Sequence, residues 1–477
     1  MPGRMPSASA GVPARKCSLP PSPRSAMPRR SPAPLPHRLQ PGGRSTLDAT
    51  SLKWRPGPMI SRKAGDRRAS AAFVLFTVAL DAICFGIVIP VLPDLVREVS
   101  HQPPSQASFY VGALFAVFSL TQFVCAPILG GLSDRYGRRP VLLTSLSALG
   151  INSLLWVWVD NLALLFAMRV FAGLFAANVP TASAYIADVT PPEQRARYFG
   201  LIGAMFGLGF ILGPVIGGIL GTYWIRLPFL VSAGLIGCNV LYGTFVLPES
   251  LPRERRRPFE WRRANPLASL LRLGRDATSL RLGFAWFATW FAIGAQQTSF
   301  ILSNQMRFGW NTLDNGLALA LGGAAQAVVQ GVLVRRVIGR IGARETAICG
   351  TLFAAAGYLV YSFAVTPWLM VSGIPILALG AMSGPPVQSL LSAAAGPQKQ
   401  GEVQGGLASL QGLAMVLGPL VMGTLFAAAT RPHGPVHVPG APFMLAALAC
   451  LAAAIGLRRV SVPDAGTATA AAEAGRA

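Results

Sequence analysis

Two charged side chains, Asp81 and Arg169, lie within long apolar stretches of the sequence. A charge at the centre of a membrane helix costs at least ~2.5–3.5 kcal/mol, so charges that remain there are candidates for function. Asp81 lies ten residues into the first apolar stretch, which is about 15 Å from its start at the helical rise. Removal from water favours the neutral form of a carboxylate, as reversible protonation requires. We predict that Asp81 exchanges a proton with Arg169 as counter-charge; the alternative is a static ion pair that only orders the helices.

Uncharged polar side chains in other apolar stretches are candidates to line a path for a solute. They are Gln122, Asn178, Gln296, Gln297, Gln326 and Gln330. Gln326 and Gln330 are four residues apart and share one face of a helix. Each of these side chains could equally form a hydrogen bond between helices.

Enzyme chemistry is not indicated by the sequence. It contains no GxxxxGK[ST] loop, no HExxH motif and no nucleophile elbow, and none of the four histidines lies in an apolar stretch. The six cysteines have no CxxC spacing, and we interpret those in apolar stretches as small packing residues. We therefore predict no catalytic residue, no metal, no cofactor and no intrinsic ATPase.

Twelve apolar segments would position these residues. Of the 477 residues, 52% are hydrophobic and 12% are charged, whereas soluble proteins have about 25% charged residues. Crossing a bilayer takes about 20 apolar residues, and lipid cannot satisfy the backbone, so each segment should be helical. The segments are residues 71–92, 109–131, 141–159, 162–186, 198–221, 227–247, 282–302, 316–334, 346–365, 368–387, 404–426 and 441–457. The fold class predicted is an all-α membrane protein with twelve transmembrane helices.

The basic residues predict an orientation. If the N-terminus is cytoplasmic, the connections on that side contain 19 Lys and Arg, against four on the other side. Cytoplasmic connections carry this excess in membrane proteins, so we predict a multi-pass protein of the inner (plasma) membrane with both termini cytoplasmic. About half of the net charge of +23 lies in residues 1–70, and the rest lies mostly in short connections between apolar segments. We therefore expect the lipid bilayer, and not nucleic acid, as the partner of these charges.

An internal repeat appears when the chain is shifted by 205 residues. The matched positions include Arg135, Gly137 and Arg139 with Arg340, Gly342 and Arg344, and Leu212, Gly213, Pro214 and Gly218 with Leu417, Gly418, Pro419 and Gly423. This predicts two parallel six-helix repeats with a substrate site between them. The halves would be residues 71–247 and 282–457, joined by a basic cytoplasmic linker, 248–281.

The two ends of the chain are predicted to be disordered tails, 1–70 and 458–477. Residues 1–70 contain 14 Lys and Arg and 13 prolines without an apolar run, so they cannot bury a core. There are two alternatives for the first tail. Translation could begin at Met59, or the tail could be an organellar transit peptide.

Several motifs resemble a known family. GGLSDRYGRRP, residues 130–140, resembles the cytoplasmic signature loop of the major facilitator superfamily. GLGFILGPVIGG, residues 207–218, resembles the antiporter signature of its twelve-span drug:proton exchangers. ALDAICFGIVIPVLPDLVRE, MRVFAGLFAAN, IADVTPPEQRARYFG and RFGW resemble the tetracycline efflux proteins, over roughly residues 72–457.

The resemblance implies an efflux transporter that exchanges a small amphipathic drug or metabolite for protons by alternating access, and we expect a monomer. It implies that the signature loop acts as a latch between the halves, through Gly130, Asp134, Arg135, Gly137, Arg138 and Arg139. The alternative is a basic loop that only sets the orientation in the membrane. Such a loop needs only its arginines, whereas Asp134 is present here and has no counterpart in the second repeat. In the antiporter motif, Gly207, Gly213, Gly217 and Gly218 would allow close helix contact and Pro214 would bend the helix.

The sequence also departs from the family. Tetracycline exporters carry further acids in spans three and nine, where this chain has Asn152 and Ala354, and some carry a histidine at the position of Gln326. These departures argue against a drug carried as a divalent-metal chelate. They also make Asp81 the predicted residue that couples proton movement to substrate movement. The alternatives are proton-linked uptake or sugar or metabolite export on the same fold, and a non-transporting membrane sensor.

Overall fold

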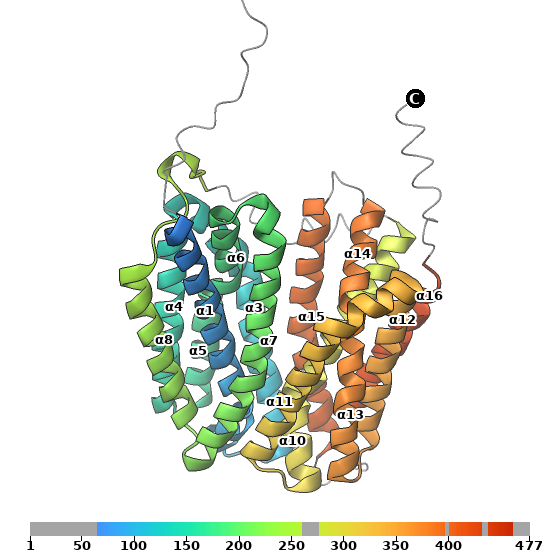
Figure 1. Ribbon diagram of the computed structural model, residues 1–477. Helices are drawn as coiled ribbons and strands as arrows, with labels where there is room; N and C mark the ends of the chain where they lie inside the picture. The colour runs from blue at the N-terminus through green and yellow to red at the C-terminus, as the bar shows by residue number, and fades with distance from the viewer. Residues whose placement is uncertain (1–63, 260–275, 396–399, 432–436, 461–477) are drawn as a thin grey trace, which may run out of the picture. The chain divides into compact units, whose positions relative to one another are not determined.

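The computed structural model describes residues 64–259, 276–395, 400–431 and 437–460. Within these ranges every regular element is a helix (Figure 1). The first six-helix half contains α1 Ala64–Val88, α2 Leu92–Ser100, α3 Pro104–Tyr136, α4 Arg138–Leu155, η1 Trp156–Trp158, α5 Leu162–Leu174, α6 Asn178–Val189, α7 Pro192–Tyr223 and α8 Leu227–Val246. The short η2 Arg253–Arg255 precedes the second half, which contains α10 Ala277–Phe308, α11 Thr312–Val328, η4 Val329–Leu333, α12 Val334–Phe363, α13 Pro367–Leu379, η5 Gly380–Ser383, α14 Gly384–Ala395, α15 Gln400–Ala429 and α16 Ala441–Arg458.

Ten helical stretches among the described residues are long and apolar enough to cross a membrane. One of them, Thr312–Phe363, has 52 residues, which is about twice the length that a bilayer core of ~30 Å requires. Its backbone leaves the helical region at Gly342, so it contains two crossings. Together with α10, which has 32 residues, these stretches make the twelve predicted spans. The predicted fold class is confirmed.

The 205-residue repeat is visible in the helix breaks. α5 and α13 each have 13 residues, and both their first and their last residues are 205 positions apart. Each is followed by a short interruption and a second helix, α6 or α14. Gly137 and Gly342, also 205 apart, have φ values of 111° and 81°, which only glycine adopts without strain. The same turn therefore separates the second and third spans of each half.

The two halves meet mainly through two pairs of helices, α7 with α11 and α15 with α3. α7 packs along α1 in its own half and along α11 in the other, while α15 packs along α10 and across on α3. We call the end of the molecule that carries residues 130–140 the loop end, and the opposite end, which carries α2, the α2 end (Figure 1). Successive spans alternate in direction, so α1 begins and α16 ends at the loop end (Figure 1).

Glycines allow these helices to touch through their backbones. A Cβ atom placed on Gly213 would lie 2.6 Å from the Cα of Gly86 in α1, and one on Gly218 would lie 3.1 Å from the Cα of Leu313 in α11. Small residues have this role in membranes because lipid supplies no hydrophobic force between helices. The prediction that Gly207 takes part is wrong for this structure, since nothing lies within 4 Å of a Cβ there.

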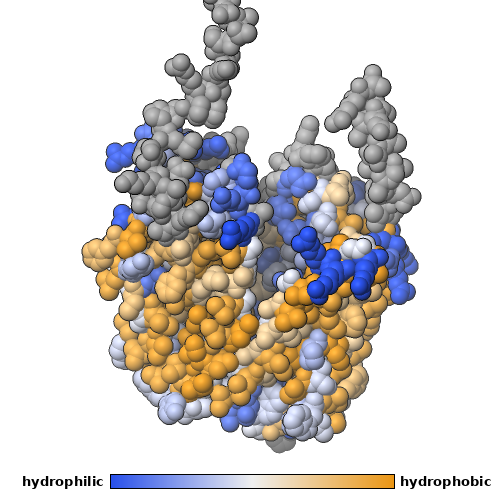
Figure 2. All heavy atoms as spheres, viewed as in Figure 1, coloured by the Kyte–Doolittle hydropathy of each residue, from blue (hydrophilic) through white to orange (hydrophobic). Residues whose placement is uncertain are grey.

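Contact between the halves is concentrated toward the α2 end. Cβ atoms on Gly200, Gly203 and Gly207, in the part of α7 nearest the loop end, would meet nothing within 4 Å. Figure 2 shows hydrophilic side chains gathered at the loop end, where the viewed face is hollowed between the halves. The second half of α7, by contrast, contacts α11 from Phe210 to Gly221. The halves are therefore closed at the α2 end and separated at the loop end.

Parts of the predicted tails and linker lie outside the described residues. The described chain begins at Ala64 with α1, so the last residues of the predicted tail 1–70 are helical. It ends at residue 460, just after α16. Of the predicted linker 248–281, residues 260–275 lie outside the described ranges.

We predict that Gly213→Ala destabilises the protein and that the matched change Gly207→Ala does not. The first adds a methyl group against the backbone of α1, for which overpacking costs about 1–3 kcal/mol. The second adds it in open space, where alanine favours the helix by up to ~1 kcal/mol. The check is the thermal unfolding midpoint of each purified variant in detergent, and equal midpoints would contradict the packing described here.

Candidate functional site

Asp81 lies half-buried in the middle of α1, where its partner is an amide. Asn178 Nδ2 donates a hydrogen bond of 3.0 Å to Asp81 Oδ1. The oxygen of the same amide, Asn178 Oδ1, is buried and has no hydrogen-bond partner. The structure thus brings together two of the predicted site residues, the carboxylate and one polar side chain of the expected path.

A break in the fourth span presents Asn178 to Asp81. The sequence predicted one helix over 162–186, but α5 ends at Leu174 and α6 begins at Asn178. The interruption frees backbone carbonyls, and Gln122 Nε2 donates to that of Ala176 over 3.2 Å. Discontinuous helices place polar groups at substrate and ion sites in many transporters. The first predicted path residue, Gln122, therefore stabilises the break.

Arg169 is held by aromatic rings and not by Asp81. Its guanidinium carbon lies 4.8 Å from the ring centre of Trp156, 5.3 Å from that of Phe115 and 5.8 Å from that of Phe118, distances at which cation–π attraction acts. The residue is 7% exposed, and its Nε and one Nη have no hydrogen-bond partner.

The predicted pairing of Asp81 with Arg169 is therefore not formed in this conformation. No ion pair between them occurs among the described residues, because Asn178 occupies the Asp81 carboxylate and three rings enclose the guanidinium. The alternative prediction, a static Asp81–Arg169 ion pair that orders the helices, is likewise not formed in this structure.

Asn152 and Ala354, which replace the family's acids, are packing residues here. With its amide in the orientation that suits both neighbours, Asn152 donates to the carbonyl of Met168 and accepts from Trp156 Nε1. It is 8% exposed and so fixes the ring that covers Arg169. Ala354, also 8% exposed, packs closely on Gly380.

The four other predicted path residues differ in their surroundings. Gln296 and Gln297 lie half-buried on α10, and Gln297 Oε1 is buried without a partner. Gln326 and Gln330 are exposed and are three and seven residues beyond Gly323, which contacts α7. Gln326 lies on α11 and Gln330 on η4, which continues it toward the loop end.

The signature loop forms an ionic cluster within the first half. Arg138 makes ion pairs with Asp134 at 2.6 Å and with Asp188 at 3.2 Å, and the side chain of Asp134 is 47% exposed. Arg135 lies over the ring of its neighbour Tyr136. Gly130 lies within α3, which runs to Tyr136, and the chain turns at Gly137.

Glu249 anchors the start of the linker on this cluster. Its carboxylate accepts from the backbone N–H groups of Arg138 at 2.9 Å, Arg139 at 3.3 Å and Leu251 at 3.0 Å. Two of these groups open α4, where unsatisfied N–H groups favour an anion. The turn leaves no room for a side chain at Gly137, since a Cβ there would meet the Glu249 carboxylate.

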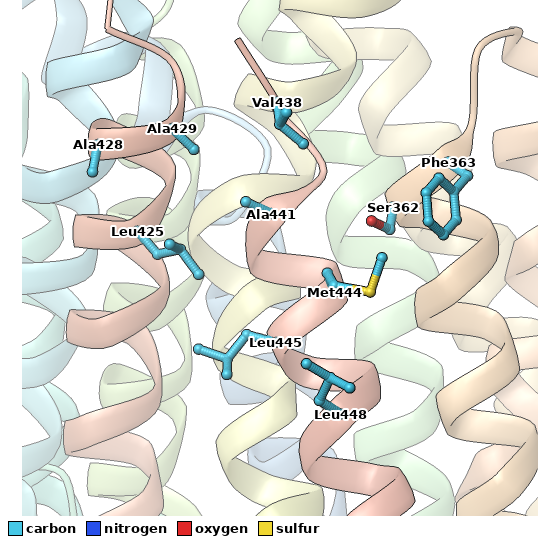
Figure 3. Close-up of a pocket in the computed structure, with 10 residues that line it drawn as sticks. All are labelled: Ser362, Phe363, Leu425, Ala428, Ala429, Val438, Ala441, Met444, Leu445 and Leu448. Carbon is cyan, nitrogen blue, oxygen red and sulfur yellow. The ribbon is translucent and has the colours of Figure 1, made fainter. Parts of the chain in front are cut away.

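A separate pocket lies on the second half and holds none of the predicted site residues. It lies between α12, α15 and α16 (Figure 3). Its lining is apolar except for Ser362, whose hydroxyl already donates to the carbonyl of Gly440 over 3.0 Å. It offers no chemistry for a polar solute, so the candidate site remains the region of Asp81, Asn178 and Arg169.

Comparison with known proteins decides the family. Residues 74–339 and 325–477 match the family model of the Major Facilitator Superfamily. The chain belongs to this superfamily. It is 39% identical over 380 residues to the class C tetracycline resistance protein of Escherichia coli, covering 79% of this chain and 95% of that one. The class G tetracycline resistance protein of Vibrio anguillarum is 36% identical over 393 residues, covering 80% and 97%.

Solved structures agree with the superfamily fold. The human organic anion transporter MFSD10 (TETRAN) matches with a TM-score of 0.61 at 25% identity, covering 82% of this chain and 99% of that one. The nucleoside transporter NupG matches with a TM-score of 0.66 at 12% identity, covering 82% and 98%, and shows the fold alone. The superfamily member described here is a membrane transporter of small molecules and not an enzyme.

Several residues of the site were missed by reasoning from sequence. Neither Asp188 nor Glu249 was predicted to belong to the site, but both join the cluster around Arg138. Gly209, whose Cβ would meet Ala82 of α1, belongs to the contact assigned to Gly207. Glycines at 209, 213 and 217 are four residues apart and share one face of a helix, and this spacing could have indicated the contact with α1.

We predict that Glu249→Ala loosens the linker and that Glu254→Ala, a change at an exposed linker position, does not. Hydrogen bonds to a charged group contribute about 1.5–3 kcal/mol, so the loss should speed local opening about tenfold or more. The check is the rate of tryptic cleavage within residues 253–257 in native protein. Equal rates for the two variants would show that Glu249 is no anchor.

Proposed function

We propose that this transporter is an efflux antiporter that exchanges a small amphipathic drug or metabolite for protons by alternating access. The observation that carries the proposal is the partner of Asp81, which is an amide and not a cation. In the described spans, Asp81 is the carboxylate that lies away from the helix ends. The names of its relatives, tetracycline resistance proteins, support a drug as substrate.

An amide can serve both protonation states of the carboxyl group. Asn178 Nδ2 donates to Asp81 Oδ1 in the structure, an arrangement that suits the ionised carboxylate. Its Oδ1 has no partner, so after a rotation of the amide it can accept from the O–H of protonated Asp81. A guanidinium partner would favour only the ionised form. The pair Asp81–Asn178 is thus suited to gain and lose a proton at low cost.

Exchange follows if proton and substrate compete for the same carboxylate. The substrate enters from the loop end and takes the place of the proton or of Asn178 on Asp81. The halves then close at the loop end and open at the α2 end, where the substrate leaves and Asp81 is protonated again. Gln296, Gln297, Gln326 and Gln330 supply further hydrogen bonds along this route, and the cluster of Asp134 and Arg138 must rearrange as the loop end closes.

An organic anion is a second candidate substrate. Arg169 has two buried nitrogen atoms without a hydrogen-bond partner, and one similar structure is titled an organic anion transporter. An anionic substrate would satisfy those N–H groups, whereas a cationic one would be repelled. Uptake of anionic and cationic probes in parallel separates the two.

We predict that Asp81→Asn abolishes gradient-driven transport, with Asp160→Asn as control, because Asp160 lies exposed in a connection at the α2 end. Everted vesicles with an acidic interior should accumulate tetracycline, used as probe, when they contain the native protein or the control. The Asp81 variant should fall to the level seen without a gradient. Accumulation by that variant would remove Asp81 from coupling, and uptake only with acid outside would indicate proton-linked uptake.

We propose that the loop end is cytoplasmic, as the basic residues predict. Val365, in the connection between α12 and α13 at the α2 end, is 83% exposed. In a chain without its native cysteines, Val365→Cys in intact cells should react with a membrane-impermeant maleimide, while Arg255→Cys at the loop end should react only after lysis. The reverse pattern would invert the topology.

A further inference from the structure

Asp94 of α2 joins the two halves at the α2 end. Its Oδ1 accepts from Gln305 Nε2 over 2.7 Å, and its Oδ2 accepts from Thr312 Oγ1 over 3.0 Å. Arg97 of the same helix donates to Gln305 Oε1 over 3.4 Å. Both oxygens of one carboxylate are thus bonded to the opposite half.

The first half holds Asp94 on a rigid support. Leu92, Leu95, Val96 and Val99 form one buried face of α2, which packs with Trp156 and Phe229 in an apolar cluster. Asp94 and Arg97 are three residues apart and share the other face. Asp94 also lies in the first turn of α2, where the helix dipole favours a carboxylate.

The second half presents its two donors at the turn between α10 and α11. Gln305 lies in the last turn of α10, which ends at Gly309 with φ 65°. Thr312 is the first residue of α11, and a Cβ on Gly221 of α7 would meet its methyl group. Thr312 is therefore placed where the end of α7 and the start of α11 are in contact.

We propose that Asp94, Gln305 and Thr312 form a gate that holds the α2 end closed and must break before substrate can leave there. The proposal rests on the alternating access proposed above. The ion pairs of Asp134, Arg138 and Asp188 lie within the first half, so they do not hold the halves together in this conformation. At the α2 end, Ser108 adds a further bond between the halves, to the carbonyl of Gly423.

The gate can open at low cost. The side chain of Asp94 is 15% exposed, and Arg97 lies 3.7 Å from it on the same helix. When the halves separate, Asp94 keeps this cation and gains water in place of Gln305 and Thr312. The carboxylate is therefore never left buried without a partner, which would be far more costly than the loss of two hydrogen bonds.

The test exchanges the amide and the carboxylate of the bond between Gln305 and Asp94, the shortest of the gate. Gln305→Glu places a second carboxylate against Asp94, with Arg97 shared between the two, and should open the α2 end. Adding Asp94→Asn restores an amide–carboxylate bond with its partners exchanged, and should close it again. Glu98→Gln is the matched control, because Glu98 lies on the same helix but pairs with Arg226 of its own half at 2.8 Å.

Spin labels report the opening. Positions 160 and 365 are exposed and equivalent in the repeat, so labels on Asp160→Cys and Val365→Cys span the α2 end of the full chain in liposomes. Double electron–electron resonance should show the population with the longer distance rising about tenfold in Gln305→Glu, a factor that corresponds to about 1.4 kcal/mol. The double variant and the control should match the unmodified protein.

An unchanged distance distribution in Gln305→Glu, or no return to the shorter distance in the double variant, would overturn the gate. A similar shift in Glu98→Gln would do the same, because it would mean that any change on α2 opens this end. These distances are measured without substrate and without a pH gradient. Failure of the gate is thus distinct from failure of proton-coupled efflux, which the Asp81 variant tests.

Discussion

Backbone contact at glycine positions of α7 is the constraint on which the two-half arrangement depends. One face of α7 touches α1 at Gly209, Gly213 and Gly217, and the neighbouring face touches α11 at Gly218. Between them, Pro214 cannot donate to the carbonyl of Phe210, and that carbonyl faces Gly323 of α11. Since lipid does not drive helices together, such contacts are the main source of association. α7 therefore cannot shift against one half without changing its fit to the other.

The repeat applies the same rule to α15. The carbonyl of Pro419 faces Gly112 of α3, as the carbonyl of Pro214 faces Gly316 of α11. The two interfaces between the halves are thus equivalent, and both are tight toward the α2 end. Helices that meet through backbone on one side and face open space on the other can rock about the contact. This is the geometry that alternating access needs, and the conformation described here is open at the loop end.

The sequence was sufficient for the fold because each step rested on a strong constraint. Apolar length predicted the spans, and the offset of 205 predicted the equivalence of Gly137 and Gly342 that the backbone shows. The site was harder to predict, because a pattern does not say which partner a side chain chooses. Asp81 had Arg169 as its only opposite charge within the spans, yet a break in span four offers it Asn178. Asp94 and Glu249 lie outside the spans, and the sequence does not show which distant groups their carboxylates meet.

The repeat also shows which residues of the signature loop, 130–140, have an equivalent in the second half and which do not. Arg139 donates to the carbonyl of Thr244 in the last turn of α8, and its equivalent Arg344 donates to those of Leu457 and Arg458 in the last turn of α16. A cation at a helix C-terminus stabilises it wherever it occurs, so this arginine serves the fold of each half. Asp134 has no such equivalent, since Gly339 takes its place. The acids that pair with Arg138, Asp134 and Asp188, therefore belong to the first half alone.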